Sequence, residues 1–201
     1  MKVESLKFRD YSLEVKGLLV ILSVLSSFLT SLEQKTLKAD FVATVAETAD
    51  APMNYPGSIT MKGKQFRLSM GSIEAAFDGQ TMYMYSAETD ELNLTSPTDR
   101  ELIESNPFLF ALEMAQQCEV TERASSDGKQ TIITLVPREE TLGINRFVLK
   151  VQNGTLLPLQ VEVREGTKTS TLTLMGPSFI TTEPKYVLEP EETTFVNDLR
   201  F

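Results

Sequence analysis

The sequence predicts a mainly β protein, in which an antiparallel sheet of short strands is accompanied by two apolar helical segments. From residue 37 onward, apolar residues recur at every second position in runs separated by turn signals, a pattern typical of a β barrel or sandwich. Before residue 36 and again over residues 98–117 the apolar residues follow helical spacing instead. Of the 201 residues, 41% are hydrophobic and 23% are charged, which is the composition of an ordinary globular chain.

The first helix is expected at residues 17–35, after an N-terminal extension at residues 1–16. Its apolar residues at helical spacing are Leu18, Ile21, Leu22, Leu25, Phe28, Leu29 and Leu32. Residues 17–25, with basic residues upstream, also fit the apolar core of an export signal, so this alternative stays open. The periodicity continues to Leu32, beyond the apolar core, and this favours the folded helix.

A meander of short strands is expected over residues 37–96. Leu37, Ala39 and Phe41 lie on one face of its first strand because side chains alternate between the two sides of a strand. Residues 49–57 contain two prolines, an asparagine and a glycine, and are predicted to be a turn. The remaining strands are expected at 59–61, 66–70, 73–77, 81–86 and 92–95, with tight turns at Gly63-Lys64 and Asp78-Gly79.

A helical lid is expected at residues 98–117. Thr98 and Glu101 have the spacing of a capping box, which starts a helix at about residue 98. Asn106-Pro107 interrupts that helix, and proline is tolerated in the first turn of the next one. The second helix, Phe108 to Gln117, is apolar over a wide arc, so it is either deeply buried or lies over an apolar cavity.

Strands resume over residues 118–201. They are expected at 120–124, 131–136, 147–151, 159–163 and 169–175, and Asn153-Gly154 is the strongest hairpin signal in the chain. The tail from residue 178 onward has no alternating pattern and is expected to be irregular. Because no change of composition divides the chain, we expect residues 1–201 to form a single domain.

The residue types present argue against catalysis. Histidine is absent, which excludes Ser-His-Asp and Cys-His mechanisms and removes the commonest transition-metal ligand. Cys118 is the only cysteine and is expected to be a buried hydrophobic residue. The acidic clusters Glu88–Glu91 and Glu189–Glu192 occur in turn-like contexts, and neither has the spacing of a calcium loop. The sequence therefore predicts no enzyme, no catalytic residue, no metal and no cofactor.

Charge and composition indicate the type of ligand instead. The formal net charge of −9 disfavours binding to a nucleic-acid phosphate backbone. The chain has 8 methionines and 11 phenylalanines but no tryptophan, and several methionines fall in predicted strands. Each could be an ordinary core residue, but methionine also suits a surface that accepts apolar chains of variable shape. A sheet that closes incompletely would leave such a surface as the lining of a cavity.

Five segments together resemble one family. They are the first helix followed by Leu37-Lys38-Ala39-Asp40-Phe41, the hairpin from Phe77 to Tyr85, the segment Asn106-Pro107-Phe108-Leu109-Phe110, the hairpin Phe147 to Val151 before Asn153-Gly154, and the ending from Leu188-Glu189-Pro190 to Asp198-Leu199-Arg200. In this order they are similar to segments of the bacterial outer-membrane lipoprotein carriers, the LolA-like family. The resemblance spans about residues 20–200.

The resemblance implies an incompletely closed antiparallel β-barrel of about 11 strands, with helices covering its concave face. It also implies a periplasmic carrier that binds the acyl chains of lipoproteins in a hydrophobic cavity. Such a carrier moves its cargo from an inner-membrane lipoprotein transporter to an outer-membrane acceptor, and we expect it to be a monomer. Well-studied members have Arg-Pro where this chain has Gly63-Lys64, so the arginine that helps to open their lid is not matched.

The candidate lipid-binding residues come from both parts of the predicted sheet and from the lid. They are Phe41, Ile59, Met61, Phe66, Leu68, Met82, Met84, Phe108, Leu112, Phe147 and Leu149. Three alternatives stay open: a carrier of another envelope lipid or glycolipid, a module that senses lipids or lipoproteins, and a plain structural domain with a solid core.

Overall fold

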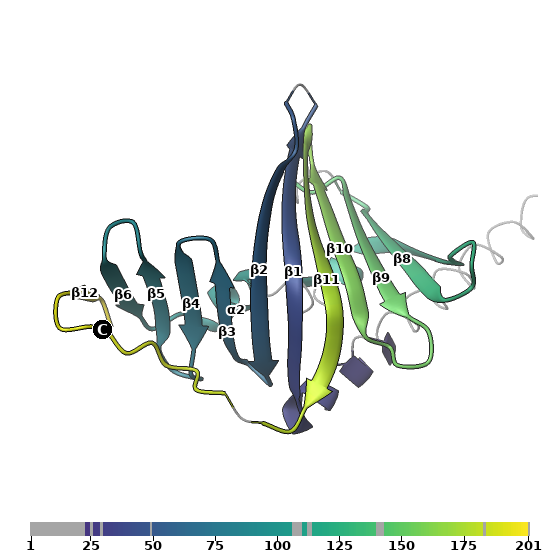
Figure 1. Ribbon diagram of the computed structural model, residues 1–201. Coiled ribbons are helices and arrows are strands. Elements are labelled where there is room, and N and C mark those ends of the chain that lie inside the picture. Colours follow the sequence, from purple (N-terminus) through teal and green to yellow (C-terminus); the bar gives the residue numbers. More distant parts are fainter. Residues whose placement is uncertain are drawn as a thin grey trace, which may run out of the picture. The chain divides into compact units, whose positions relative to one another are not determined.

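The computed structural model describes residues 23–24, 26–28, 30–48, 50–105, 110–111, 114–139, 143–182 and 184–200. Its strands form one sheet in the order β12-β6-β5-β4-β3-β2-β1-β11-β10-β9-β8-β7 (Figure 1). The strands are β1 (Thr36–Glu47), β2 (Met53–Lys62), β3 (Gln65–Met70), β4 (Ile73–Phe77), β5 (Met82–Ser86), β6 (Glu91–Thr95), β7 (Cys118–Ala124), β8 (Gln130–Pro137), β9 (Arg146–Gln152), β10 (Pro158–Glu165), β11 (Lys168–Ile180) and β12 (Phe195–Asp198). Within the described residues β12 and β7 do not pair, so the predicted incompletely closed sheet is confirmed.

The chain divides into two compact units. The first comprises the described residues of 1–28, 44–53 and 106–172, and the second comprises those of 29–43, 54–105 and 173–201. Two of the divisions fall inside the long strands β1 and β11, which therefore contribute residues to both units. The expectation of a single domain stays a prediction.

The first unit has an antiparallel sheet with one closely buried face. Val120 pairs with Leu135 and Leu135 pairs with Phe147, while Ile133 pairs with Leu149. All five side chains point to the same side, because directly paired residues share a face, and all are buried. The helical residues Ala111, Met114 and Ala115 of this unit are buried as well.

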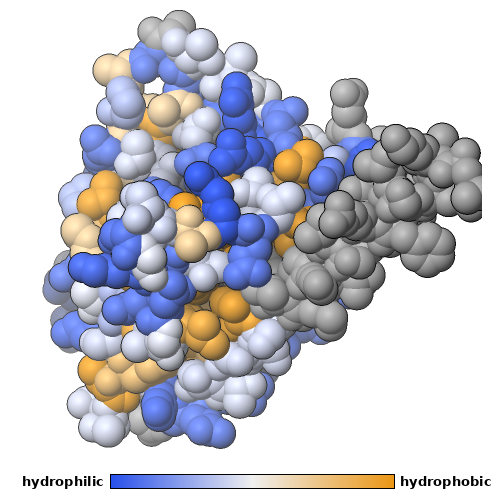
Figure 2. All heavy atoms as spheres, turned by 90° about the vertical axis from the view of Figure 1, so that its right-hand side faces the viewer, coloured by the Kyte–Doolittle hydropathy of each residue, from blue (hydrophilic) through white to orange (hydrophobic). Residues whose placement is uncertain are grey.

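The surface turned toward the viewer in Figure 2 is mostly hydrophilic. Its hydrophobic residues lie in small separate groups among the hydrophilic ones. Such scattered groups are normal on the surface of a soluble domain and do not by themselves indicate a binding site.

The second unit contains the meander β2–β6, with β12 added in parallel beside β6. The predicted turn over residues 49–57 is too long, because the chain leaves the strand only between Glu47 and Met53, and β2 already includes Pro56 and Gly57. Gly57 lies inside the strand for a packing reason. A Cβ atom at this position would overlap the ring of Phe41 and the carbonyl oxygen of Ser69. Glycine there signals a close approach within the sheet rather than a turn.

The predicted capping box is confirmed at the start of α2 (Asp99–Ser105). The Thr98 N–H donates to Oε2 of Glu101 at 2.7 Å, and the Glu101 N–H donates back to Oγ1 of Thr98 at 3.3 Å. Lys64 Nζ lies 3.3 Å from Oδ1 of Asp99, which places the start of α2 beside the β2–β3 turn.

The predicted first helix is confirmed for its described residues, which are helical at 23–24, 26–28 and 30–34. Its end is fixed beside the same β2–β3 turn, since the Gly63 N–H donates to the Leu32 carbonyl oxygen at 2.8 Å. Within the described part of the chain, no helix combines the length and the apolar character needed to cross a membrane.

The C-terminal segment, residues 184–200, is more ordered than the sequence predicts. The expectation of an irregular tail is wrong at two places, because β11 continues to Ile180 and Phe195–Asp198 form β12. The segment crosses the meander on the side opposite α2 before it reaches β6 (Figure 1). On that side Leu188 joins a buried cluster with Ala76, Leu92 and Leu94. We call residues 184–200 the C-terminal strap.

Asp90 fixes the strap to the sheet. Its carbonyl oxygen accepts from the Phe195 N–H at 3.0 Å, and its Oδ1 accepts from the hydroxyls of Thr194 at 3.0 Å and Tyr85 at 3.2 Å. Its φ of 48° lies in the left-handed region, which aspartate tolerates better than most residues. Three hydrogen bonds, two of them from the strap, thus hold Asp90 in a strained backbone conformation in the turn between β5 and β6.

Asp90→Ala should lower the free energy of unfolding by about 2 kcal/mol, because it removes two hydrogen bonds to a charged acceptor and keeps the strained φ. Asp90→Asn should cost less, since asparagine can accept one of these bonds and tolerates the same backbone. Urea denaturation of the three proteins measures both differences. An unchanged stability of Asp90→Ala would show that the strap does not depend on this residue.

Candidate ligand-binding face

The register of β2–β5 gathers apolar side chains on one side of the second unit. Ile59 pairs with Leu68, Leu68 with Ala75, and Ala75 with Met84. A second row runs beside the first, from Met61 through Phe66 and Phe77 to Met82. Paired residues share a face, so both rows lie on the same side of the four strands. We call this surface the apolar face; it consists of Ile59, Met61, Phe66, Leu68, Ala75, Phe77, Met82 and Met84.

Six of the residues predicted from the sequence to bind lipid therefore lie together. These are Ile59, Met61, Phe66, Leu68, Met82 and Met84. Phe41 joins them, because its ring occupies the space beside Gly57, which precedes Ile59 by two positions on the same side of β2. That these residues bind a ligand stays a prediction.

The apolar face is only partly covered. Met61 and Phe77 are buried, at the end of the strands where α2 begins and the first helix ends. The Phe66 and Phe77 ring centroids lie 6.3 Å apart in a tilted arrangement. Leu68 is half-buried, and Met84 is 51% exposed. In the row farther from these turns Ala75 is buried, Ile59 and Leu68 are partly exposed and Met84 is exposed, so this row includes the most open position of the face.

Two further features shape the open row. Ala75 is the smallest side chain in it and stands between Leu68 and Met84, so the surface is low at its centre. On β6 the rows end in polar residues, since Met84 pairs with Asn93 and Met82 pairs with Thr95. The apolar face therefore has a polar border on the β6 side.

Two further predicted residues, Phe147 and Leu149, are buried on the closely packed face of the first unit. Phe108 and Leu112 lie outside the described residues. A common cavity between these residues and the apolar face stays a prediction.

The β4–β5 turn holds the closed end of the apolar face in position. Asp78 Oδ1 accepts from the N–H groups of Gln80 at 2.9 Å and Thr81 at 2.8 Å, and its Oδ2 accepts from the Tyr83 hydroxyl at 2.9 Å. Burial acts to raise the pKa of Asp78, but these donors outweigh it and keep the pKa below the ordinary value of 3.8. Burial and the Asp78 carboxylate both raise the pKa of Tyr83 above 10.0.

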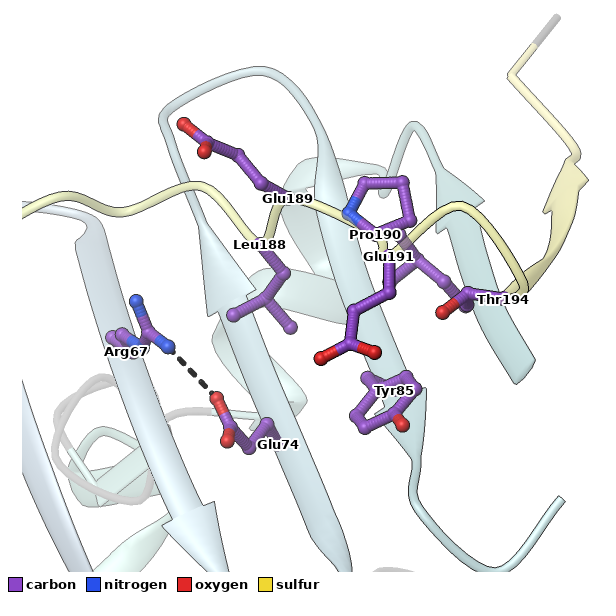
Figure 3. A pocket seen from close by; sticks show the side chains of 9 residues that line it. Arg67, Glu74, Tyr85, Leu188, Glu189, Pro190, Glu191 and Thr194 are labelled. Carbon is purple, nitrogen blue, oxygen red and sulfur yellow. Dashed lines mark hydrogen bonds and ion pairs between the residues drawn. The ribbon is translucent and has the colours of Figure 1, made fainter. Parts of the chain in front are cut away.

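A pocket of about 170 Å³ lies on the opposite side of the same strands, beneath the C-terminal strap (Figure 3). Its lining comes from both the meander and the strap: Arg67, Glu74, Tyr85, Leu92, Leu188, Glu189, Pro190, Glu191 and Thr194. Sequence reasoning missed this pocket, because its walls are about a hundred residues apart in the chain. The sequence does show that Tyr83 and Tyr85 alternate with Met82 and Met84, which places the tyrosines on the pocket side of β5.

The chemistry available at the apolar face is non-covalent burial. Its members carry no nucleophile, acid or base. Among the residues that the structure describes, no group of three or more cysteine, aspartate or glutamate side chains is arranged to hold a metal ion. What this face can do is remove apolar groups of a ligand from water.

Comparison with solved structures shows the fold. An uncharacterized conserved protein from Thermus thermophilus matches with a TM-score of 0.55 at 11% identity, covering 86% of this chain and 98% of that one. A structure of the MucA/MucB complex of Pseudomonas aeruginosa matches with a TM-score of 0.51 at 14% identity, covering 82% of this chain and 58% of the matched chain. This protein thus spans little more than half of that chain. The predicted fold class is confirmed.

Matches of lower TM-score include a LolA superfamily protein from Nitrosomonas europaea, at 0.37 and 8% identity, covering 77% of this chain and 94% of that one. This is the family that the sequence motifs resemble. No protein-family model matches the sequence, and a search of curated proteins finds no match.

Gly57→Ala should lower the free energy of unfolding by about 1–3 kcal/mol, because the new methyl group overlaps the Phe41 ring and the Ser69 carbonyl oxygen. Ser58→Ala is the matched control, since the Ser58 side chain is exposed and points to the other side of β2. Thermal or urea unfolding compares the two variants with the unchanged protein. Equal stability of both variants would contradict the close approach of Phe41 to β2.

Proposed function

We propose that the apolar face binds an acyl chain of a lipid or lipoprotein, and that this protein is a non-catalytic carrier of such molecules in the bacterial cell envelope. The observation that supports this most is the open apolar row across β2–β5. Leu68 and Met84 are left partly exposed there, although neighbouring residues of the same face are buried. A single exposed apolar side chain is normal, but a contiguous apolar patch such as this row is typical of a binding surface.

The dimensions of the face suit a single acyl chain. Four adjacent strands span about 14 Å, from three spacings of about 4.8 Å each. Burying eight methylene groups along such a row would contribute roughly 6 kcal/mol, before the cost of association is subtracted. Methionine side chains can adjust to chains of different length or branching, so specificity for one acyl chain would be low.

The polar border on β6 gives the ligand a direction. Asn93 and Thr95 end the two rows, and both can form hydrogen bonds with the polar part of an amphiphile. The acyl chain would then extend from β6 toward β2, where Phe41 and Gly57 mark the far side of the face.

The periplasmic location, the inner-membrane transporter and the outer-membrane acceptor follow from the resemblance of the sequence motifs to LolA-like carriers, and they belong to this proposal. Weak, adaptable binding suits a monomeric carrier, because such a carrier must release its cargo to an acceptor. A second candidate is a module that senses lipids or lipoproteins and binds a protein partner, as the matched MucB chain is bound to MucA in its structure. Binding of a protein partner in the absence of any lipid would separate this candidate from the carrier.

Met84→Glu should weaken the binding of palmitate or a triacylated lipopeptide at least about tenfold, because a carboxylate placed under the acyl chain must lose its water. The variant should still fold, since Met84 is 51% exposed. Displacement of a fluorescent fatty acid measures the affinity, and circular dichroism checks the fold.

Ser58→Glu is the matched control for this experiment. It adds the same charge to the same four strands, but on the opposite side and at an exposed position, so its affinity should equal that of the unchanged protein. Absence of saturable binding to the unchanged protein would refute the proposal. Equal losses in both variants would show that charge, rather than the apolar face, decides binding.

A further inference from the structure

The pocket beneath the C-terminal strap has an aromatic and apolar base. Figure 3 shows the ring of Tyr85 below the side chain of Glu191, with Leu188 descending from the strap beside them. Leu92 of β6 and Pro190 of the strap complete the apolar part of the lining. The Tyr85 hydroxyl donates to Asp90, so its ring is held in one position under the pocket. A fixed aromatic ring at the base of a small pocket is a preformed contact surface for a ligand.

The charged groups around this base are mainly negative. Figure 3 shows the Glu191 carboxylate pointing down toward the Tyr85 ring, with Glu74 on the neighbouring strand. Arg67 Nη2 lies 2.9 Å from Oε2 of Glu74, so this guanidinium is already paired. Burial, the hydrogen bond to Asp90, and the charges of Asp90, Glu191 and Glu74 all raise the pKa of Tyr85. The phenol therefore lies in a negative potential, which repels anions and attracts cations.

The size of the pocket narrows the class of ligand. At about 170 Å³ it is smaller than the roughly 300–1,000 Å³ of a site for a drug-sized molecule. A second acyl chain would also have to bury the Glu191 carboxylate, which points into the pocket. A small organic cation meets neither obstacle, because its charge faces the carboxylates and its methyl or methylene groups contact the ring.

We propose that this pocket binds the ammonium group of a small alkylammonium compound, with the nitrogen over the Tyr85 ring and beside Glu191. The ring face attracts the cation through its quadrupole, and the carboxylate adds direct charge attraction. Leu188 and Pro190 cover the alkyl part from the strap. The site lies on the other side of β3–β6 from the apolar face and is independent of the acyl-chain proposal.

A phosphate beside the ammonium group would weaken binding. The Glu191 carboxylate, which points into the pocket, would repel it, and the Arg67 guanidinium is already paired with Glu74. Glu189 adds little to this repulsion, because it points away from the pocket and pairs with Lys185. The pocket therefore favours a free ammonium compound over the zwitterionic head group of a phospholipid. Choline and glycerophosphocholine separate these two sources. Both carry the same quaternary ammonium group, but only glycerophosphocholine has a phosphate beside it.

In the test, the full chain is titrated with choline while NMR records the signals of the labelled tyrosine rings. The Tyr85 ring signals should shift in a saturable way. The uncharged isostere of choline, in which carbon replaces the nitrogen, should cause no saturable shift, and glycerophosphocholine should bind more weakly than choline. Equal binding of choline and its isostere, or equal binding of choline and glycerophosphocholine, would overturn the proposal.

Glu191→Gln should weaken choline binding about fivefold, because it removes the charge with almost no change of shape. Glu192→Gln is the matched control, since it removes an equal charge from the next residue, which does not line the pocket. Tyr85→Leu should weaken binding at least as much as Glu191→Gln. Unchanged affinity in Glu191→Gln would overturn the proposal even if Tyr85→Leu fails to fold, because Glu191 is exposed and its replacement should leave the fold intact.

Discussion

The strict alternation of side chains along β2–β5 is the constraint on which the rest of the second unit depends. Antiparallel pairing aligns Leu68, Ala75 and Met84 on one side of the sheet, and it places the tyrosines of β5 and the Arg67–Glu74 pair on the other. A shift of one residue in register would exchange the two sides completely. One short meander therefore carries an apolar surface and a polar, aromatic surface back to back.

The C-terminal strap makes the second of these surfaces possible. Leu188 packs on the cluster around Leu92, and the hydrogen bonds of Asp90 hold the segment that follows. Without the strap, Tyr85 would lie on an open sheet rather than at the base of a pocket. Pairing of β12 with β6 also protects an edge that would otherwise offer unpaired backbone groups to other chains.

The alternation itself could be read from the sequence, and this is why six predicted residues share the apolar face. The capping box at Thr98 and Glu101 was predictable for the same reason, because it depends on neighbouring residues. Gly57 was misread as part of a turn, since its role depends on the distant Phe41 ring. β12 was missed because four residues without alternation form a strand only when β6 is beside them. Local patterns were thus predictable, whereas features that need a distant partner were not.

Contact between an acyl chain and the methionine side of β5 is tested most directly with a spin-labelled fatty acid. Met82, Tyr83, Met84 and Tyr85 are consecutive, yet they alternate between the two surfaces. With labelled methionine methyl groups and tyrosine rings, the bound spin label should broaden the signals of Met82 and Met84 much more than those of Tyr83 and Tyr85. Equal broadening of all four, or stronger broadening of the tyrosines, would contradict acyl-chain binding at the apolar face.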